Sequence, residues 1–195
     1  MYRSNKTPVQ IKKTCLEIRT VVSYLKMIKK KMCLIGPFGV GKTSLIRKYV
    51  LNIYSEEYHS TVGVKIDKKN LKLETGEEIV LLIWDLEGND DINVITESYL
   101  QGMSGYFLVA DGTRPETLEI VASIRGHLTD RFPHAASTLL INKYDLAEEW
   151  AVNDADITPF TDKGISVLYS SAKTGSGVEN AFIQIAHQMI ANGDD

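Results

Sequence analysis

The segment Gly36-Pro37-Phe38-Gly39-Val40-Gly41-Lys42-Thr43 constrains the fold of this chain more than any other stretch. It follows the apolar run 32–35, typical of a short buried strand, and precedes 44–50, whose apolar residues recur at helical spacing. Three glycines let the intervening backbone curl so that successive N–H groups face one point, where the start of the helix adds positive charge. The segment therefore predicts a strand, an anion-binding loop and a helix, a combination typical of a nucleotide phosphate site.

Within this loop, two side chains are expected to bind the ligand in addition to the backbone N–H groups. Lys42 is expected to reach the β- and γ-phosphates, and the Thr43 hydroxyl to ligate Mg²⁺. A chance match in a glycine-containing turn is the alternative, but glycine makes up only about 7% of residues in average proteins, so such matches are rare. The predicted phosphate contacts are Gly36, Phe38, Gly39, Val40, Gly41, Lys42, Thr43 and Ser44.

The rest of the chain alternates strand-like apolar runs with helix-like segments, which predicts an α/β fold of the P-loop NTPase kind. We expect a six-stranded, mostly parallel sheet with helices on both faces. The short connection 74–77 predicts one antiparallel edge strand. Strands are predicted near 31–36, 62–73, 78–84, 105–111, 137–142 and 165–169, and helices near 42–52, 91–101, 115–130, 153–162 and 177–191.

Composition is that of an ordinary globular protein, with 44% hydrophobic and 24% charged residues. No run of 18 apolar residues and no signal-peptide pattern occurs, so we expect a cytoplasmic protein. Two cysteines and four scattered histidines favour neither a disulfide framework nor a thiolate or imidazole metal site. We further expect a monomer with no nucleic-acid partner.

The net charge of −3 is unevenly distributed. Residues 1–31 hold nine lysines and arginines against one glutamate, and apolar residues between 11 and 25 recur at helical spacing. Residues 1–26 therefore form either a basic amphipathic helix for an anionic membrane or a partner, or a dispensable segment before an alternative start at Met27. The main domain is expected over 27–191, with a frayed tail at 192–195.

A second group of polar residues indicates which base is bound. Asn142-Lys143-Tyr144-Asp145 follows one predicted strand, and Ser171-Ala172-Lys173 follows the next, where an open α/β sheet places its ligands. The Asp145 carboxylate can accept from both N1–H and the exocyclic amine of guanine, an edge that adenine lacks. Lys143 can lay its stem over the base, and backbone N–H groups of the 171–173 turn can face the guanine carbonyl.

Five motifs in order resemble those of the small GTPases of the Ras superfamily, closest to the Rab group and to Rab-like prokaryotic members. The resemblance covers residues 27 to about 191. It rests on Gly36 to Thr43, Tyr58-His59-Ser60-Thr61-Val62-Gly63, Trp84-Asp85-Leu86-Glu87-Gly88, Asn142 to Asp145, and Ser171 to Lys173. It implies binding of GTP and GDP with Mg²⁺, and two switch regions near 54–63 and 86–100.

The resemblance also implies roles for single residues. Thr61 would ligate Mg²⁺ and sense the γ-phosphate, Asp85 would hold Mg²⁺ through water, and Gly88 would donate its N–H to the γ-phosphate. Asp85 has independent support, because it ends a buried strand-like run and Mg²⁺ prefers few carboxylates. Tyr54 would lie edge-on to the base, with a core tyrosine as the alternative.

Three residues depart from the family pattern around the γ-phosphate. Phe38 replaces a glycine, and its ring would crowd an activator's arginine. Asn89 replaces the glutamine that orients water and is about 1.5 Å shorter, which predicts slow hydrolysis. Glu87 replaces a small residue and either repels the γ-phosphate, contacts Mg²⁺ indirectly, helps to order the water or is a solvated loop residue.

These observations predict a molecular switch in signalling that hydrolyses GTP slowly, with Lys42, Thr61, Asn89 and Glu87 as the catalytic candidates. The alternative is a GTP-binding interaction module without hydrolysis. Effectors and regulators would bind through the switch regions. No C-terminal cysteine is present to receive a prenyl group, so membrane contact is expected only through the basic N-terminal segment, as would suit a prokaryotic member.

Overall fold

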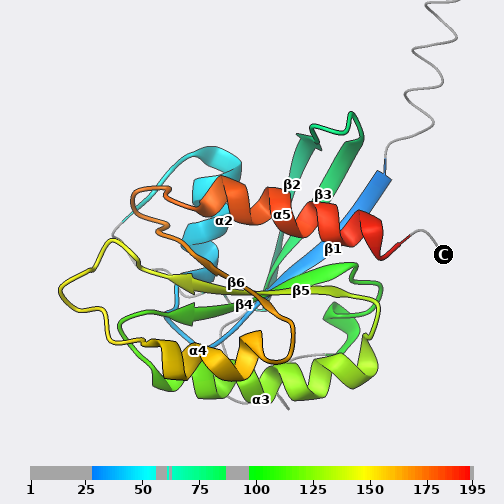
Figure 1. Cartoon of the computed structure of the whole chain (residues 1–195). Helices are drawn as coiled ribbons and strands as arrows, with labels where there is room; N and C mark the ends of the chain where they lie inside the picture. Colours follow the sequence, from blue (N-terminus) through cyan, green and yellow to red (C-terminus); the bar gives the residue numbers. More distant parts are fainter. Residues whose placement is uncertain (1–27, 56–60, 62, 87–96, 194–195) are drawn as a thin grey trace, which may run out of the picture.

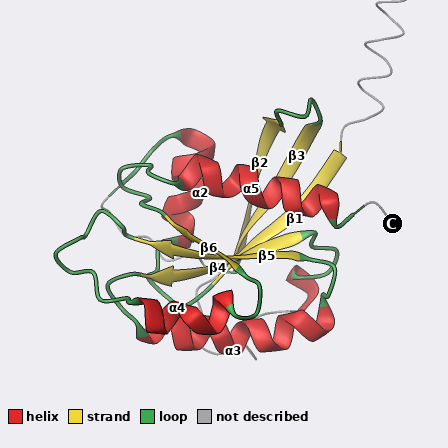
Figure 2. Ribbon diagram, in the orientation of Figure 1, coloured by secondary structure: helices red, strands yellow, loops and turns green. Residues whose placement is uncertain are grey.

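A computed structural model describes residues 28–55, 61, 63–86 and 97–193 of the chain. Six strands form one sheet in the order β2-β3-β1-β4-β5-β6 (Figures 1 and 2). Every neighbouring pair is parallel except β2 with β3. The strands are β1 (Ile28–Ile35), β2 (Val64–Lys72), β3 (Glu78–Leu86), β4 (Gly105–Asp111), β5 (Ala136–Asn142) and β6 (Ser166–Tyr169).

Within the described residues, four α-helices cover the two faces of the sheet. They are α2 (Lys42–Leu51), α3 (Glu116–Arg131), α4 (Asp154–Thr161) and α5 (Val178–Ala191). Helices α2 and α5 pack on one face, and α3 and α4 on the other (Figure 1). Successive side chains of β1 point to opposite faces of the sheet. Met32 and Leu34 pack in the core beneath α2 and α5, and Cys33 and Ile35 pack in the core beneath α3 and α4. None of the described helices is long and apolar enough to cross a bilayer.

Aromatic packing fixes α2 against α5. The rings of Tyr49 in α2 and Phe182 in α5 stack with their centroids 3.8 Å apart, and Phe107 of β4 meets Phe182 edge-on at 5.1 Å. The three-ring contact holds α2 to both the sheet and α5. Nearer the start of α2, where the glycine-rich loop ends, Leu45 and Ile46 are buried in the same core.

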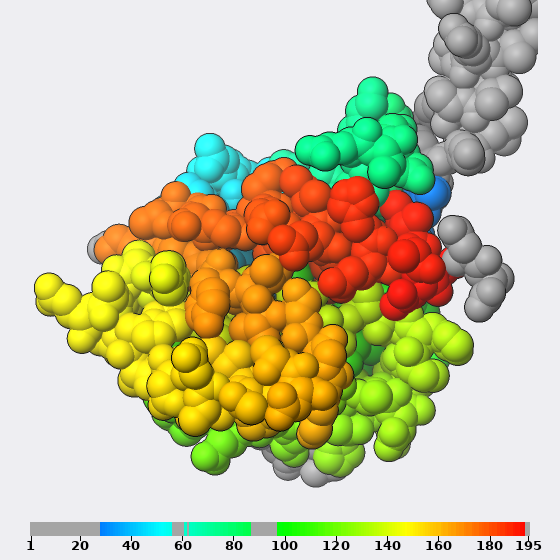
Figure 3. All heavy atoms as spheres, viewed as in Figure 1, coloured from blue at the N-terminus to red at the C-terminus, as the bar shows by residue number. Residues whose placement is uncertain are grey.

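The edge strand β2 is mostly exposed and belongs to a hairpin with β3 whose tip extends beyond α5 (Figure 3). Four of its nine residues are lysines, and lysine on an edge strand discourages pairing with another chain. These lysines are Lys65, Lys68, Lys69 and Lys72.

The carboxyl ends of β1, β3, β4, β5 and β6 lie at one edge of the sheet, since these strands are parallel. The connection after β1 leads to the helix on one face, and the connection after β4 leads to the helix on the other. A crevice for a ligand is expected between two such connections. The loops after β1, β4 and β5 therefore meet where the sequence predicts a nucleotide.

The predicted fold class is confirmed. Strand β1 begins at residue 28 rather than 31 because its three lysines continue the pairing with β3. The predicted helix 91–101 falls partly on residues 91–96, outside the described residues. Its described part is a 3-10 turn, η2 (Glu97–Tyr99), after which the chain turns at Gly102 with φ 70°. The predicted N-terminal segment 1–26 also lies outside the described residues.

Candidate nucleotide-binding site

The loop between β1 and α2 is curled, and two of its glycines are required by close approaches. A Cβ on Gly36 would overlap the carbonyl oxygen of Val109, and one on Gly41 would overlap the side-chain amide of Asn142. Gly39 and Gly41 also have φ of 75° and 97°, which side-chain-bearing residues rarely adopt. The sequence pattern thus corresponds to a loop pressed against β4 and β5.

Lys42 begins α2, and only 6% of it is exposed. Its ammonium donates to the carbonyl oxygens of Gly36 at 2.8 Å and Pro37 at 3.0 Å. The positive charge therefore lies across the loop itself, beside the start of a helix. Anionic phosphate oxygens are stronger acceptors for an ammonium than neutral carbonyls are.

The three predicted metal ligands lie together. The Thr43 hydroxyl donates to Asp85 Oδ2 at 2.7 Å and lies 2.8 Å from the Thr61 hydroxyl, which is 3.4 Å from the same carboxylate oxygen. Asp85 is 1% exposed, and this burial raises its pKa, although hydrogen bonds from the two threonines oppose the shift. Its other oxygen, Oδ1, is buried and has no hydrogen-bond partner among the described residues.

This donor set fits Mg²⁺, which binds hard oxygen ligands and usually takes one or two carboxylates together with phosphates and water. Two hydroxyls and one carboxylate supply such oxygens. The Oδ1 atom of Asp85, which has no hydrogen-bond partner among the described residues, can still accept a ligand. Thr43, Thr61 and Asp85 are thus the residues that would hold the cation. A bound cation would neutralise charge on the phosphates.

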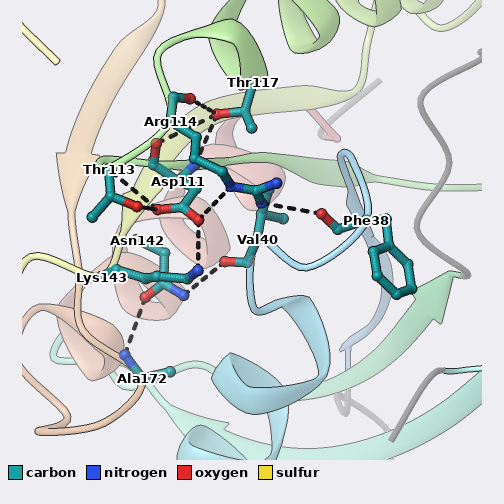
Figure 4. A network of polar contacts seen from close by, with 9 residues as sticks. All are labelled: Phe38, Val40, Asp111, Thr113, Arg114, Thr117, Asn142, Lys143 and Ala172. Atoms are coloured by element: carbon teal, nitrogen blue, oxygen red, sulfur yellow. Dashed lines mark hydrogen bonds and ion pairs between the residues drawn. The ribbon is translucent and has the colours of Figure 1, made fainter. Parts of the chain in front are cut away.

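Asn142 joins three loops at the opposite end of the site. Its side-chain nitrogen donates to the Val40 carbonyl at 2.9 Å, and its side-chain oxygen accepts from the Ala172 amide at 3.1 Å (Figure 4). The Ser170 hydroxyl lies 3.4 Å from the same oxygen. The sequence predicted that backbone N–H groups of this turn face the guanine, but the Ala172 amide donates to Asn142 and so positions the loops.

Asp145 is oriented by the neighbouring loop. Its Oδ1 accepts from the Ser171 hydroxyl at 2.5 Å, and that hydroxyl in turn accepts from the Thr174 amide at 3.0 Å. Lys143 has φ of 68°, the left-handed conformation that non-glycine residues adopt mainly at constrained sites. The chain of hydrogen bonds from the Thr174 amide through the Ser171 hydroxyl therefore fixes the orientation of the Asp145 carboxylate.

Sequence reasoning missed Asp111, which is fully buried at the end of β4. Its Oδ2 accepts from Lys143 Nζ at 2.5 Å and Arg114 Nε at 2.9 Å, and its Oδ1 accepts from the amide and hydroxyl of Thr113 at 3.0 and 2.8 Å. Burial alone would raise the pKa of Asp111, but these hydrogen bonds outweigh it and lower the pKa. The available signal was an acid ending a buried strand, as Asp85 does.

Comparison with known proteins identifies the family. The model of the Ras family matches residues 31–191. The chain belongs to the Ras family. It is similar to the Ras-related protein RABA1a of Arabidopsis thaliana, with 35% identity over 164 residues that cover 82% of this chain and 74% of that protein. It is accordingly a Rab-like small GTPase of the Ras superfamily, whose members bind GTP and GDP.

The remaining residues predicted for this small GTPase lie at the rim of the site or outside the described residues. Tyr54 is 39% exposed, which argues against the alternative of a core tyrosine. Phe38 is 52% exposed, and its ring points away from Asp111 and Arg114 (Figure 4). Lys173 is exposed and Ser44 half-buried. The predicted residues outside the described part are Tyr58, His59, Ser60, Val62, Glu87, Gly88 and Asn89.

Proposed function

We propose that this chain is a guanine-nucleotide switch that binds GTP and GDP with Mg²⁺ and hydrolyses GTP slowly. The observation that carries the proposal is a pair of hydrogen bonds, in which the Asn142 side chain donates to the Val40 carbonyl and accepts from the Ala172 amide, because they unite the phosphate loop and the base loops in one site. The cluster of Thr43, Thr61 and Asp85 supports the metal requirement.

Guanine selection depends on Asp145, whose carboxylate accepts from the two adjacent N–H donors of guanine. Lys143 would flank the base, with its ammonium held by Asp111. Both residues follow β5, at the carboxyl edge of the sheet. A base placed there lies on the far side of Asn142 from the metal ligands.

The proposed reaction is in-line attack of water on the γ-phosphate. Lys42 and the loop N–H groups stabilise the negative charge that develops on the phosphate oxygens. Asn89 or Glu87 would place the water. The shorter reach of Asn89 and the bulk of Phe38 are the reasons to expect a slow intrinsic rate and a poor fit for an activator's arginine.

A second candidate, a GTP-binding module that does not hydrolyse, is favoured by the same departures from the family pattern at positions 38 and 89. In both candidates GTP would order residues 54–63 and 86–100, through Thr61 and Gly88, and present them to effectors and regulators. The two candidate functions differ only in whether the chain hydrolyses its bound GTP to GDP. We place this switch in the cytoplasm, with any membrane contact made by the basic segment 1–26.

Single-turnover hydrolysis of GTP with Mg²⁺ separates the two candidates. The switch predicts slow release of phosphate by the wild type, and Asn89→Gln is expected to speed it about tenfold to a hundredfold by restoring the reach of the amide. Phosphate release by wild type and variant at the uncatalysed background would instead favour the non-hydrolysing module.

Base choice is tested by titrating GTP and ATP into Asp145→Asn. The amide turns one acceptor into a donor facing a guanine donor, so GTP affinity is expected to fall at least about a hundredfold. Asp162→Asn, at the exposed end of α4, is the matched control and should bind as the wild type does. Unchanged affinity in Asp145→Asn, or equal wild-type affinity for GTP and ATP, would overturn the base assignment.

A further inference from the structure

An arginine from the connection between β4 and α3 contacts the back of the phosphate loop. Arg114 Nη2 donates to the carbonyl oxygen of Phe38 at 3.1 Å (Figure 4). The two residues are 76 positions apart in the chain, so only the fold brings them together. Gly39, the next residue, lies close enough that a Cβ there would stand 3.6 Å from the same guanidinium nitrogen.

The contact between Arg114 and Phe38 also affects the direction of the Gly39 N–H, because the two groups belong to one planar peptide bond. In a planar trans peptide the C=O and the following N–H point in opposite directions. Holding the Phe38 carbonyl toward Arg114 therefore turns the Gly39 N–H the other way, toward the inside of the curl. N–H groups on the inside of such a loop are the donors that bind phosphate oxygens.

The arginine is itself held by a buried anion. Asp111 Oδ2 accepts from Arg114 Nε at 2.9 Å and, on the same atom, from Lys143 Nζ at 2.5 Å. Thr113 donates twice to the other oxygen, so the carboxylate has no freedom to follow the arginine outward. Asp111 is fully buried whereas the Arg114 side chain is 39% exposed, so this pair is screened less by solvent than a pair of two exposed side chains.

Only an arginine spans this gap in the observed way. Its rigid fork donates through Nε to Asp111 and through Nη2 to Phe38 at once. A lysine carries one compact ammonium on a flexible stem, which cannot reproduce two donors at fixed separation. The chain thus has a side chain suited to linking the base side of the site with the phosphate loop.

We propose that Arg114 is a positioning residue that aims the Gly39 amide at the phosphates, and that Asp111 couples it to Lys143 beside the base. The inference rests on the proposed guanine-nucleotide site and adds to it a residue on the back of the loop. Arg114 acts through the Phe38–Gly39 peptide and does not contact the nucleotide itself.

The test compares Arg114→Met and Arg114→Lys with Arg131→Met, which removes an exposed arginine at the far end of α3 that pairs with Glu97. GDP affinity is measured by calorimetry. The amide resonance of Gly39 and the ³¹P resonance of the bound β-phosphate are measured by NMR. We expect both Arg114 variants to bind GDP about tenfold more weakly and to shift both resonances, while Arg131→Met changes neither.

Arg114→Lys keeps the charge, so a shift in its Gly39 resonance shows that the fork geometry matters rather than the charge alone. Wild-type resonances and affinity in a folded Arg114→Met, with only a lower melting temperature, would mean that the arginine merely stabilises the fold and would overturn the proposal. Should Arg114→Met fail to fold, Arg114→Lys decides by the same two resonances. A wild type that binds no guanine nucleotide would instead overturn the proposed function.

Discussion

The two ends of the candidate site differ in how their polar groups are satisfied. At the base end, Asn142, Asp145 and Asp111 each accept or donate hydrogen bonds within the protein, across loops that follow different strands. At the metal end, Asp85 keeps a buried oxygen without a partner among the described residues, and Lys42 donates to carbonyls of its own loop.

This difference indicates two kinds of binding surface. The base end is organised by contacts within the folded chain, so ligand binding there loses little conformational entropy. The metal end holds a charge and a carboxylate oxygen whose better partners would arrive with the ligand. Changes at the base end should therefore cost stability as well as affinity, whereas changes at the metal end should cost affinity without lowering stability.

The largest effect is expected from Lys42→Ala, at the metal end. Loss of charge-assisted contacts to two phosphates should lower GTP affinity by about a thousandfold, measured by calorimetry. The melting temperature without nucleotide should change little. Lys163→Ala, an exposed lysine after α4, is the control. A large fall in melting temperature with retained affinity would reverse the assignment of the two ends.

Asn142→Ala should be the most costly change at the base end for the folded chain itself. It leaves the Val40 carbonyl and the Ala172 amide unpaired, so the free energy of unfolding should fall by about 2–4 kcal/mol without any nucleotide. Urea unfolding measures this loss. Asn153→Ala removes the N-cap of α4 and should cost about 1 kcal/mol without affecting GTP binding. Equal losses in both variants would contradict the base-end role of Asn142.

Asp111→Asn tests whether the base end depends on a charge. The folded-state pKa of Asp111 lies below its ordinary 3.8, so its contribution to stability is present above that pH and is lost as the pH falls through the folded value. The variant should lose about 1–2 kcal/mol near neutral pH and should show a flatter decline in acid. Urea midpoints between about pH 2 and about pH 7 measure it. Parallel profiles for wild type and variant would show that the charge contributes nothing.

Asp85→Asn should change the stability of the folded chain less than the two changes at the base end, and in the opposite direction. Because burial raises the folded-state pKa of Asp85 above 3.8, the wild type loses stability as the pH rises through that shifted pKa. Without Mg²⁺ or nucleotide, the variant should therefore be about 1 kcal/mol more stable near pH 7, with the difference vanishing in acid. It should also lose the gain in GTP affinity that Mg²⁺ gives the wild type. Asp67→Asn, in the hairpin, is the control. A destabilised Asp85→Asn would mean that the carboxylate is satisfied by the protein alone.

The features of the fold and the site that could be predicted from the sequence are those that depend on neighbouring residues. Alternating and helical apolar patterns placed the six strands and four of the helices to within a few residues, since each pattern is read within one element. The predicted helix 91–101 was wrong in its described part, where a short 3-10 turn over 97–99 is followed by a glycine with positive φ at position 102. Among the site residues, the structure brings Thr43, Thr61 and Asp85 together as the motifs suggested.

The roles of Asp111 and Arg114 could not be found in this way, although Asp111 shares with Asp85 its place at the end of a buried strand. Neither belongs to a motif with a spacing rule, and their partners at positions 38 and 143 lie far away in the chain. The same holds for the Ala172 amide, whose partner Asn142 is 30 residues earlier. Such pairs form because the loops that follow β1, β4, β5 and β6 lie side by side at one edge of the sheet.

The sequence by itself determined the order of the elements, the curl of the glycine loop and the identity of the family, because periodicity, backbone freedom and motif spacing are local properties. Only the tertiary structure decided which buried carboxylate is paired and which keeps an unpartnered oxygen, and that an arginine lies behind the phosphate loop. Those outcomes depend on distances between segments that the packing of α2 and α5 on one face, and α3 and α4 on the other, brings together.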